Sequence, residues 1–278
     1  MKLLVCSLPD EASVNIRQAL LGIAGWAAVG EFEGREVLGR EDSLLVQIDS
    51  LHLYSDGIDH RVRESTGLDI DDVIFLSRHR AASGIHTLTV HPIGNYEKAE
   101  LGGRDRTLVP SSPRLMTGVL KRLTRESAGT GFKVSFEVTH HGPHLDTPAL
   151  FVEIGSDESM WGDKVAARAV AASVLSPDSV AGPVAIGVGD GHYAPRFSEV
   201  ILTKEVSFGH MIPNYAIENV ADEDVRRCIE MARDGTKGAE CVYIQRKSMK
   251  RSRATSIRRI VEDIGLRLVD SDELADAA

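Results

Sequence analysis

A group of histidines in the middle of the chain is the first candidate for chemistry. Three of the ten histidines, His140, His141 and His144, fall within five positions, and Asp146 follows them closely. Imidazoles are the commonest general bases near neutral pH and common zinc ligands. The apolar run that comes next carries a carboxylate, Glu153. We therefore predict a site made of these side chains, in which histidine acts as a base or shares a zinc ion with one of the two acids.

The backbone of this segment is predicted to be a loop. Gly142 and Pro143 separate the second histidine from the third, and both residue types interrupt helices. His141 and His144 therefore cannot share one helical face as the two histidines of an H-E-x-x-H motif do. A polar turn whose histidines cap backbone groups is the structural alternative, and it accounts for one histidine better than for three beside an acid.

Strand ends are predicted to bring further histidines to the same place. Four predicted strands end at His79, His91, His140 and His192. Ligands of open α/β sheets bind beyond the carboxyl ends of the strands. We expect His79 and His192 to join the cluster. His91 and His210 fit partly exposed loop residues equally well, and His52 and His60 fit that description better.

Alternating strands and helices define the fold class. We predict strands over 2–6, 43–48, 73–76, 85–91, 132–138, 148–154, 183–188, 198–203, 241–245 and 266–269, with helices near 14–20, 113–128, 158–175, 222–233 and 252–264. This order is typical of an α/β protein with a mixed, mostly parallel sheet flanked by helices. The 278 residues suffice for a single unit, 1–278, or for two closely packed α/β subdomains whose boundary the sequence does not mark.

Composition excludes several classes of protein. The three cysteines, Cys6, Cys228 and Cys241, lie far apart, which argues against a disulfide framework or a thiolate zinc site and fits a reducing cytoplasm. No apolar run is long enough to span a membrane. The net charge of −9 argues against a surface that is basic throughout. Segment 246–259 nevertheless holds seven arginines and lysines and no acid, so we predict that Lys250, Arg251 and Arg253 contact phosphates.

Glycine-rich turns are the other candidate substrate contacts. The run Gly-Val-Gly-Asp-Gly at 187–191 departs from the dinucleotide fingerprint, because His192 stands where the third glycine belongs and the following Tyr-Ala-Pro offers no helix start. We predict that Gly142, Gly189 and Gly191 let a substrate approach closely and form rigid walls.

Several blocks of the sequence resemble the archaeal and plant type of D-aminoacyl-tRNA deacylase. They are Ala-Ser-Val-Asn-Ile (12–16), Ser-Arg-His-Arg-Ala-Ala-Ser-Gly (77–84), Leu-Thr-Val-His-Pro-Ile-Gly-Asn (88–95), Thr-His-His-Gly-Pro-His (139–144), Glu-Ile-Gly-Ser (153–156), Trp161 and Gly-Asp-Gly-His-Tyr (189–193). These blocks extend over most of the chain, and the histidine block is specific.

The resemblance implies a cytoplasmic, monomeric, zinc-dependent enzyme that hydrolyses the ester between a D-amino acid and the 3′ end of tRNA. It also implies a fold similar to phosphorylases and peptidyl-tRNA hydrolases. The chemistry needs an activated water and donors for the developing oxyanion, for which Arg78 and Arg80 or the glycine-rich turns are candidates. Tentative zinc ligands are His140, His141, His144, Asp146 and Glu153.

Two other functions stay open at this point. A phosphorylase-like or nucleosidase enzyme would use the same crevice, with Arg78 and Arg80 on phosphate. A non-catalytic RNA-binding protein would need only the basic segment and would leave the histidines unexplained.

Overall fold

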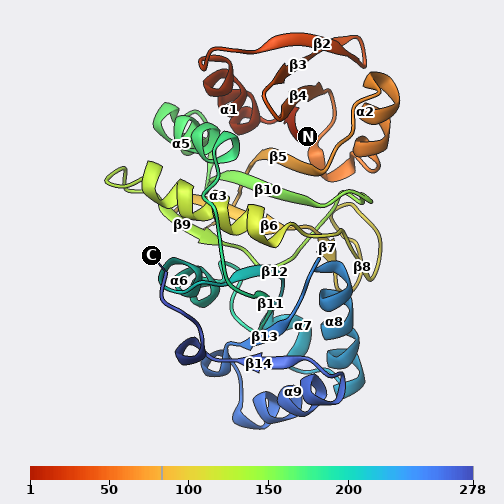
Figure 1. Ribbon diagram of the computed structural model, residues 1–278, viewed down its shortest axis with the longest axis vertical. Coiled ribbons are helices and arrows are strands. Elements are labelled where there is room, and N and C mark those ends of the chain that lie inside the picture. Colours follow the sequence, from red (N-terminus) through yellow and green to blue (C-terminus); the bar gives the residue numbers. More distant parts are fainter. Residues whose placement is uncertain (83, 278) are drawn as a thin grey trace.

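The computed structural model describes residues 1–82 and 84–277 and contains two β-sheets stacked along its longest axis (Figure 1). The larger sheet has the strand order β2-β3-β4-β1-β5-β10-β6-β9 and the smaller one β12-β11-β13-β14. A two-stranded ribbon, β7-β8, lies beside them. Within the described residues, no helix is both long and apolar enough to cross a lipid bilayer.

The larger sheet is parallel at its centre and antiparallel toward its edges. Strands β4, β1, β5 and β10 run parallel, β6 pairs antiparallel with β10, and β9 runs parallel to β6. Its strands are β1 (Lys2–Ser7), β2 (Ala27–Phe32), β3 (Arg35–Arg40), β4 (Ser43–Ile48), β5 (Asp72–Arg78), β6 (Thr87–Pro92), β9 (Lys133–Phe136) and β10 (Ala149–Gly155). The ribbon consists of β7 (Gly94–Asn95) and β8 (Thr107–Leu108).

Helices cover both faces of this sheet. One face packs against α1 (Glu11–Leu21), α3 (Pro113–Glu126) and α5 (Lys164–Leu175), which supply a continuous apolar core. The other face packs against α2 (Ile58–Thr66). Short helices η1 (His52–Tyr54) and α4 (Glu158–Trp161) follow strands β4 and β10. The mixed, mostly parallel sheet flanked by helices confirms the predicted fold class.

The smaller sheet is fully parallel. It contains β11 (Val184–Val188), β12 (Ser207–Ile212), β13 (Cys241–Ile244) and β14 (Arg267–Val269). Its helices are α6 (Pro195–Thr203), α7 (Asn214–Ile217), α8 (Asp222–Gly235) and α9 (Arg251–Asp263), with short turns η2 (Arg246–Ser248) and η3 (Ser271–Glu273). The apolar cluster under α3 and α5 continues through Phe197 and Phe208, so the two sheets share a core.

Three sequence predictions are wrong, and each has a local cause. Residues 198–203 are helical, because Pro195 begins α6 and Asp190 accepts a hydrogen bond from the backbone of Arg196, capping the helix from a distance. The turn after His192 therefore does offer a helix start. The expected helix 158–175 is two helices, since Asp163 caps α5 by accepting from the backbone of Val165. Strands β2, β3 and β12 were not predicted.

Candidate active site

Five histidines and two glutamates meet on one face of the larger sheet, where they belong to or follow strands β5, β6, β9, β10 and β11. Residue alternation along the strands places Phe75 and Ser77 of β5, and Phe151 and Glu153 of β10, on one sheet face. The ring of His91 in β6 stacks on Phe151 with an interplanar angle of 3°. This aromatic floor carries the cluster formed by His79, His91, His140, His141, His192, Glu137 and Glu153.

Glu137 lies at the centre of the cluster. Its carboxylate is fully buried, and its oxygens lie 3.1 Å from Nδ1 of His79, 3.4 Å from Nε2 of His140 and 3.2 Å from Nε2 of His192. Neither oxygen has a partner in hydrogen-bond geometry. A buried carboxylate without such partners is costly, so this centre favours a cationic occupant or protonated imidazoles.

Glu153 is the second buried acid. Its Oε2 lies 3.4 Å from Nδ1 of His79 and 3.8 Å from Nε2 of His91. Burial alone would raise the pKa of Glu153, but the two histidines hold it below its ordinary value. Burial likewise opposes protonation of His79 and His91, yet Glu153 and Glu137 raise the pKa of both imidazoles.

Three of the histidines have fixed ring orientations. Nδ1 of His91, His140 and His141 lies 3.1, 2.7 and 2.7 Å from the carbonyl oxygens of Pro92, Val138 and Gly142. Because a carbonyl only accepts, each Nδ1 donates its proton and each neutral ring keeps its lone pair on Nε2. One nitrogen from each ring lies within 4.8 Å of the other two. Such backbone-oriented histidines are typical of metal ligands.

The neighbouring rings differ in basicity. Burial lowers the pKa of His141 to about 4, and the positive charge of protonated His91 acts in the same direction. Burial, together with the charges of His91, His141 and His192, also holds the pKa of His140 well below its ordinary value. His192 is the accessible member, with 41% of its side chain exposed.

The cluster opens into a cavity of about 350 Å³. Its lining residues are Asp10, Leu51, His52, Leu53, Ser77, Arg78, His79, Arg80, Leu101, His140, His141, Glu153 and His192. The guanidinium groups of Arg78 and Arg80 lie 4.9 and 5.0 Å from the ring centre of Trp161. The Trp161 indole N–H donates to the backbone oxygen of His79, so one buried ring orients both cations and the backbone that follows β5.

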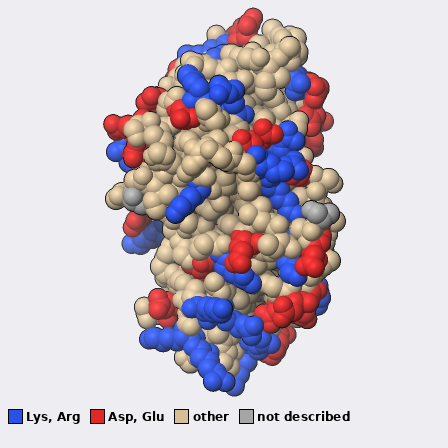
Figure 2. All heavy atoms as spheres, turned by 90° about the vertical axis from the view of Figure 1, so that its left-hand side faces the viewer, with Lys and Arg blue, Asp and Glu red and all other residues tan. Residues whose placement is uncertain are grey.

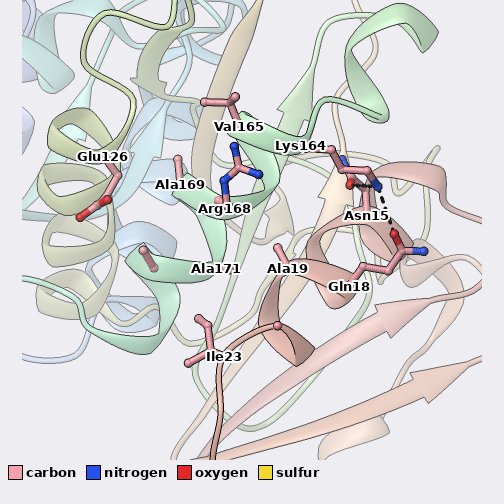
Figure 3. A pocket seen from close by; sticks show the side chains of 12 residues that line it. Asn15, Gln18, Ala19, Ile23, Glu126, Lys164, Val165, Arg168, Ala169 and Ala171 are labelled. Atoms are coloured by element: carbon pink, nitrogen blue, oxygen red, sulfur yellow. Dashed lines mark hydrogen bonds between the residues drawn. The ribbon is translucent and has the colours of Figure 1, made fainter.

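Larger cavities elsewhere lack this chemistry. A cavity of about 620 Å³ lies between α1 and α5, where Lys164 donates to Asn15 and Gln18 (Figure 3). Another, of about 760 Å³, lies near the amino ends of β5 and β10. No histidine occurs among the described residues that line either one. The histidine cavity is therefore the candidate active site.

Some predicted site residues lie outside the cluster. Nε2 of His144 is 3.9 Å from Asp146, whose carboxylate is 72% exposed and pairs with His60 at 2.8 Å. The structure therefore does not bring His144 or Asp146 to the other predicted ligands. Pro143 separates them by turning the chain toward α2, where the backbone N–H of His144 donates to Asp56.

The three predicted glycine walls have different surroundings. Gly142 packs against the backbone of Gly102 and Gly103, which leaves no room for a side chain. Gly189 has a positive φ and packs under Met249. Gly191 has no neighbour within side-chain reach. None of the three is among the residues that line the cavity, where Leu51, Leu53 and Leu101 stand instead.

The basic segment lies beside the glycine-rich turn that leads to His192. Met249 and Ser248 contact Gly189, and Asn214 bonds to both the side chain and the backbone of Ser248. Lys250 and Arg251 are exposed. Arg253 is only 16% exposed and forms an ion pair with Asp222 at 2.8 Å. Its guanidinium is thus engaged within the protein, and its contact with phosphate stays a prediction.

Five residues of the site are not indicated by the sequence predictions. Glu137 lies within the predicted strand 132–138, three positions before His140, and is not among the predicted site residues. His91 and His52 were read as exposed or ambiguous and are buried, as is His210. Tyr193, whose hydroxyl lies 3.0 Å from Nε2 of His79, and Asp10 were not considered. Only the spacing of Glu137 to His140 offered a signal.

Comparison with known proteins gives consistent results. The family model described as D-aminoacyl-tRNA deacylase matches residues 66–269. A D-aminoacyl-tRNA deacylase of Methanosarcina mazei is 38% identical over 98% of this chain and 93% of that protein. The one from Methanosarcina barkeri is 37% identical over 98% of this chain and 90% of that protein. The Methanococcoides burtonii relative is longer, and the match covers 57% of it at 37% identity.

A solved structure has the same fold. A crystal structure described as a conserved protein of unknown function superimposes with a TM-score of 0.85 at 31% identity, covering 99% of this chain and 98% of that one.

Proposed function

Because this chain belongs to the D-aminoacyl-tRNA deacylase family, we propose that the histidine–glutamate cluster is the centre at which it hydrolyses the ester bond of D-aminoacyl-tRNA. The reaction releases the free D-amino acid and the tRNA. The observation that carries this assignment is the buried Glu137, which three histidines surround at the base of an open cavity. General bases and oriented acids of this kind are what ester hydrolysis requires.

The donor set fits a zinc ion, which we propose as a cofactor. Nε2 of His91 and both oxygens of Glu137 are buried without a hydrogen-bond partner, as expected of atoms that await a cation. His91, His140 and His141 would hold the ion, and three histidines are a ligand set that zinc enzymes use. Zinc bound there supplies a Lewis acid and lowers the pKa of water. This set replaces the tentative ligands His144 and Asp146 and leaves Glu153 as a charged neighbour.

The remaining residues have separate roles in hydrolysis. His192, which is accessible and held by Glu137, takes the proton from the water that attacks the ester carbon. The same imidazole returns this proton to the ribose 3′ oxygen when the carbon–oxygen bond breaks. His79 is fixed between Tyr193 and the two glutamates, and it positions their carboxylates. Backbone N–H groups and the Arg78 guanidinium are the donors available to the oxyanion.

Basic groups beside the cavity would hold the tRNA. Arg80 at the rim is 67% exposed, and Lys250 and Arg251 lie in the segment that covers Gly189. Figure 2 shows Lys and Arg side chains gathered at the lower end of the molecule, where α9 lies in Figure 1. We expect the enzyme to act as a monomer in the cytoplasm, where charged tRNA is used.

The function is tested by following loss of the acyl group from D-tyrosyl-tRNA and L-tyrosyl-tRNA. The proposal expects release of D-tyrosine in large excess over L-tyrosine. Phosphate-dependent cleavage of free nucleosides would instead support a phosphorylase-like enzyme. Binding of tRNA without any release of amino acid would support a non-catalytic RNA-binding protein.

A further inference from the structure

Asp10 is a second acid that lines the cavity, beside Glu153. Asp10 follows strand β1, and its side chain is 2% exposed. Its Oδ1 accepts from the backbone N–H of Ser13 and so caps helix α1. The other oxygen, Oδ2, accepts from the backbone N–H of Arg78 at 3.1 Å and from the hydroxyl of Ser77 at 3.3 Å. Helix capping thus accounts for only one of the two oxygens.

The charge of Asp10 has no cationic partner of its own. In residues 1–82 and 84–277, the only basic nitrogen within 4.0 Å of this carboxylate is Nδ1 of His52, at 3.9 Å. Burial lowers the pKa of His52 to about 4, so this ring is neutral at physiological pH. The Arg78 guanidinium lies over the Trp161 ring. Burial raises the pKa of Asp10, and the backbone N–H groups of Ser13 and Arg78, with the more distant charge of Arg78, oppose this rise. A cation bound in the cavity would add a direct ion pair to these hydrogen bonds.

Unlike Asp10, Glu137 and Glu153 both lie next to histidine rings. Glu153 has imidazole nitrogens of His79 and His91 within 3.8 Å, and Glu137 is surrounded by three histidines. Asp10 is therefore the acid in the cavity that is free to pair with a substrate cation. An aminoacyl ester carries such a cation, its α-ammonium group, one carbon away from the bond that is cut.

Asp10 lies close to the histidine–glutamate cluster across two neighbouring strands. Ser77, which donates to Asp10, is paired in register with Glu153 on the neighbouring strand. Neighbouring strands are about 4.8 Å apart. Asp10 and the histidine–glutamate cluster are thus connected through adjacent positions of β5 and β10, and both line the same cavity.

We propose that Asp10 binds the α-ammonium group of the aminoacyl ester, with the Ser77 hydroxyl as a second acceptor. This inference rests on the proposed function and names the part of the cavity that recognises the amino acid. Fixing the ester carbon and the ammonium leaves two directions for the side chain, which exchange between enantiomers. An ammonium group fixed by Asp10 thus lets the cavity wall distinguish the two enantiomers by the direction of the side chain. Leu51, Leu53 and Leu101 line the same cavity.

The test compares two substrates and one isosteric variant. Wild-type enzyme and Asp10→Asn are given tRNA esterified with D-tyrosine, or with the matching hydroxy acid, which replaces the ammonium by a hydroxyl group. Asparagine caps helices as well as aspartate does, so the helix cap is kept. We expect the ratio of kcat/KM for the amino ester to that for the hydroxy ester to fall at least about tenfold, as loss of one charge-assisted bond implies.

A matched control is Asp163→Asn, which alters the cap of α5 outside the cavity and should leave this ratio at the wild-type value. Equal losses for both esters in Asp10→Asn would overturn the proposal and assign Asp10 a purely structural role. If Asp10→Asn does not fold, the same ratio is measured in Ser77→Ala, where a wild-type value would also overturn it. Wild-type enzyme that cleaves neither ester would refute the proposed function instead.

Discussion

Nε2 of His192 lies 3.2 Å from Oε2 of Glu137, and this contact joins the two sheets of the protein at one chemical group. Glu137 follows β9 of the larger sheet, whereas His192 follows β11 of the smaller one. The backbone N–H of Val138 donates to the carbonyl of His192, which fixes the two loops against each other. The site therefore exists only when both sheets are folded and packed.

Removing the charge of Glu137 should abolish most of the activity. We expect Glu137→Gln to lower hydrolysis of D-tyrosyl-tRNA by at least about a hundredfold, because three histidines lose the acid that orients them. Glu126→Gln, on the surface of α3, is the control. Circular dichroism checks the fold. Wild-type turnover in a folded Glu137→Gln protein would exclude this residue from the mechanism.

Zinc content follows from the three-histidine set. Protein purified without added metal should contain stoichiometric zinc by elemental analysis, and His141→Ala should lose most of it. Chelation should remove activity, and added zinc should restore it. Full activity in protein shown to be free of metal would leave direct histidine catalysis as the better account.

The basic segment should separate into phosphate contacts and structural contacts. Replacing Lys250 and Arg251 with serine should weaken tRNA binding and reduce the slope of log K against log salt by roughly 0.7–0.9 per lost contact. Arg253→Ser should instead lower stability by on the order of 2 kcal/mol, because its guanidinium bonds to Asp222 and to the carbonyl of Val220. An unchanged salt slope in the double variant would make this segment an ordinary solvated surface.

The pair formed by His60 and Asp146 predicts a titration on the surface of the protein. The hydrogen bond to Asp146 raises the pKa of His60, and the same bond lowers the pKa of Asp146. The stabilisation from His60 is therefore complete below its unfolded pKa of about 6.5 and is lost as pH rises through the higher folded value. The contribution of Asp146 is present above about pH 3.9 and is lost as pH falls through its lower folded pKa.

NMR titration of His60 is the measurement for this pair. Its midpoint should lie above 6.5 in the wild type and move down in Asp146→Asn. A midpoint that the substitution leaves in place would mean that the two side chains do not interact in solution.

Local patterns predicted those elements whose apolar spacing is unambiguous. Strands β1, β4 and β10 are continuous apolar runs, and α3 and α8 have regular apolar faces between clear start and stop signals. The run Val-Ile-Leu-Thr at 200–203 is rich in β-branched residues, and it is nevertheless helical because Phe197 and Ile201 face the shared core. Tertiary packing overrides strand propensity at this point.

The sequence indicated the loop that holds His140 and His141, but it did not indicate Glu137 as the acid beside them. Clustering alone indicated His140 and His141, and strand ends indicated His79 and His192. Glu137 alternates with apolar neighbours like a residue on a solvated strand face. It is buried because α6 packs against β9 and because His79 and the loop that holds His192 lie against it. Asp146 is close to the histidines in sequence, but Pro143 redirects the chain. The nearest acid in sequence therefore lies beside His60 and His144 and not beside His140 and His141.

His140 is the histidine whose place in the hydrolytic centre matters most to the proposed mechanism. Single-turnover hydrolysis of D-tyrosyl-tRNA by His140→Ala, compared with His60→Ala, tests it directly, since His60 is exposed and lies outside the cavity. We expect the rate of hydrolysis to fall at least about a hundredfold in His140→Ala and to keep its wild-type value in His60→Ala, with both proteins folded. A wild-type rate in folded His140→Ala would contradict it.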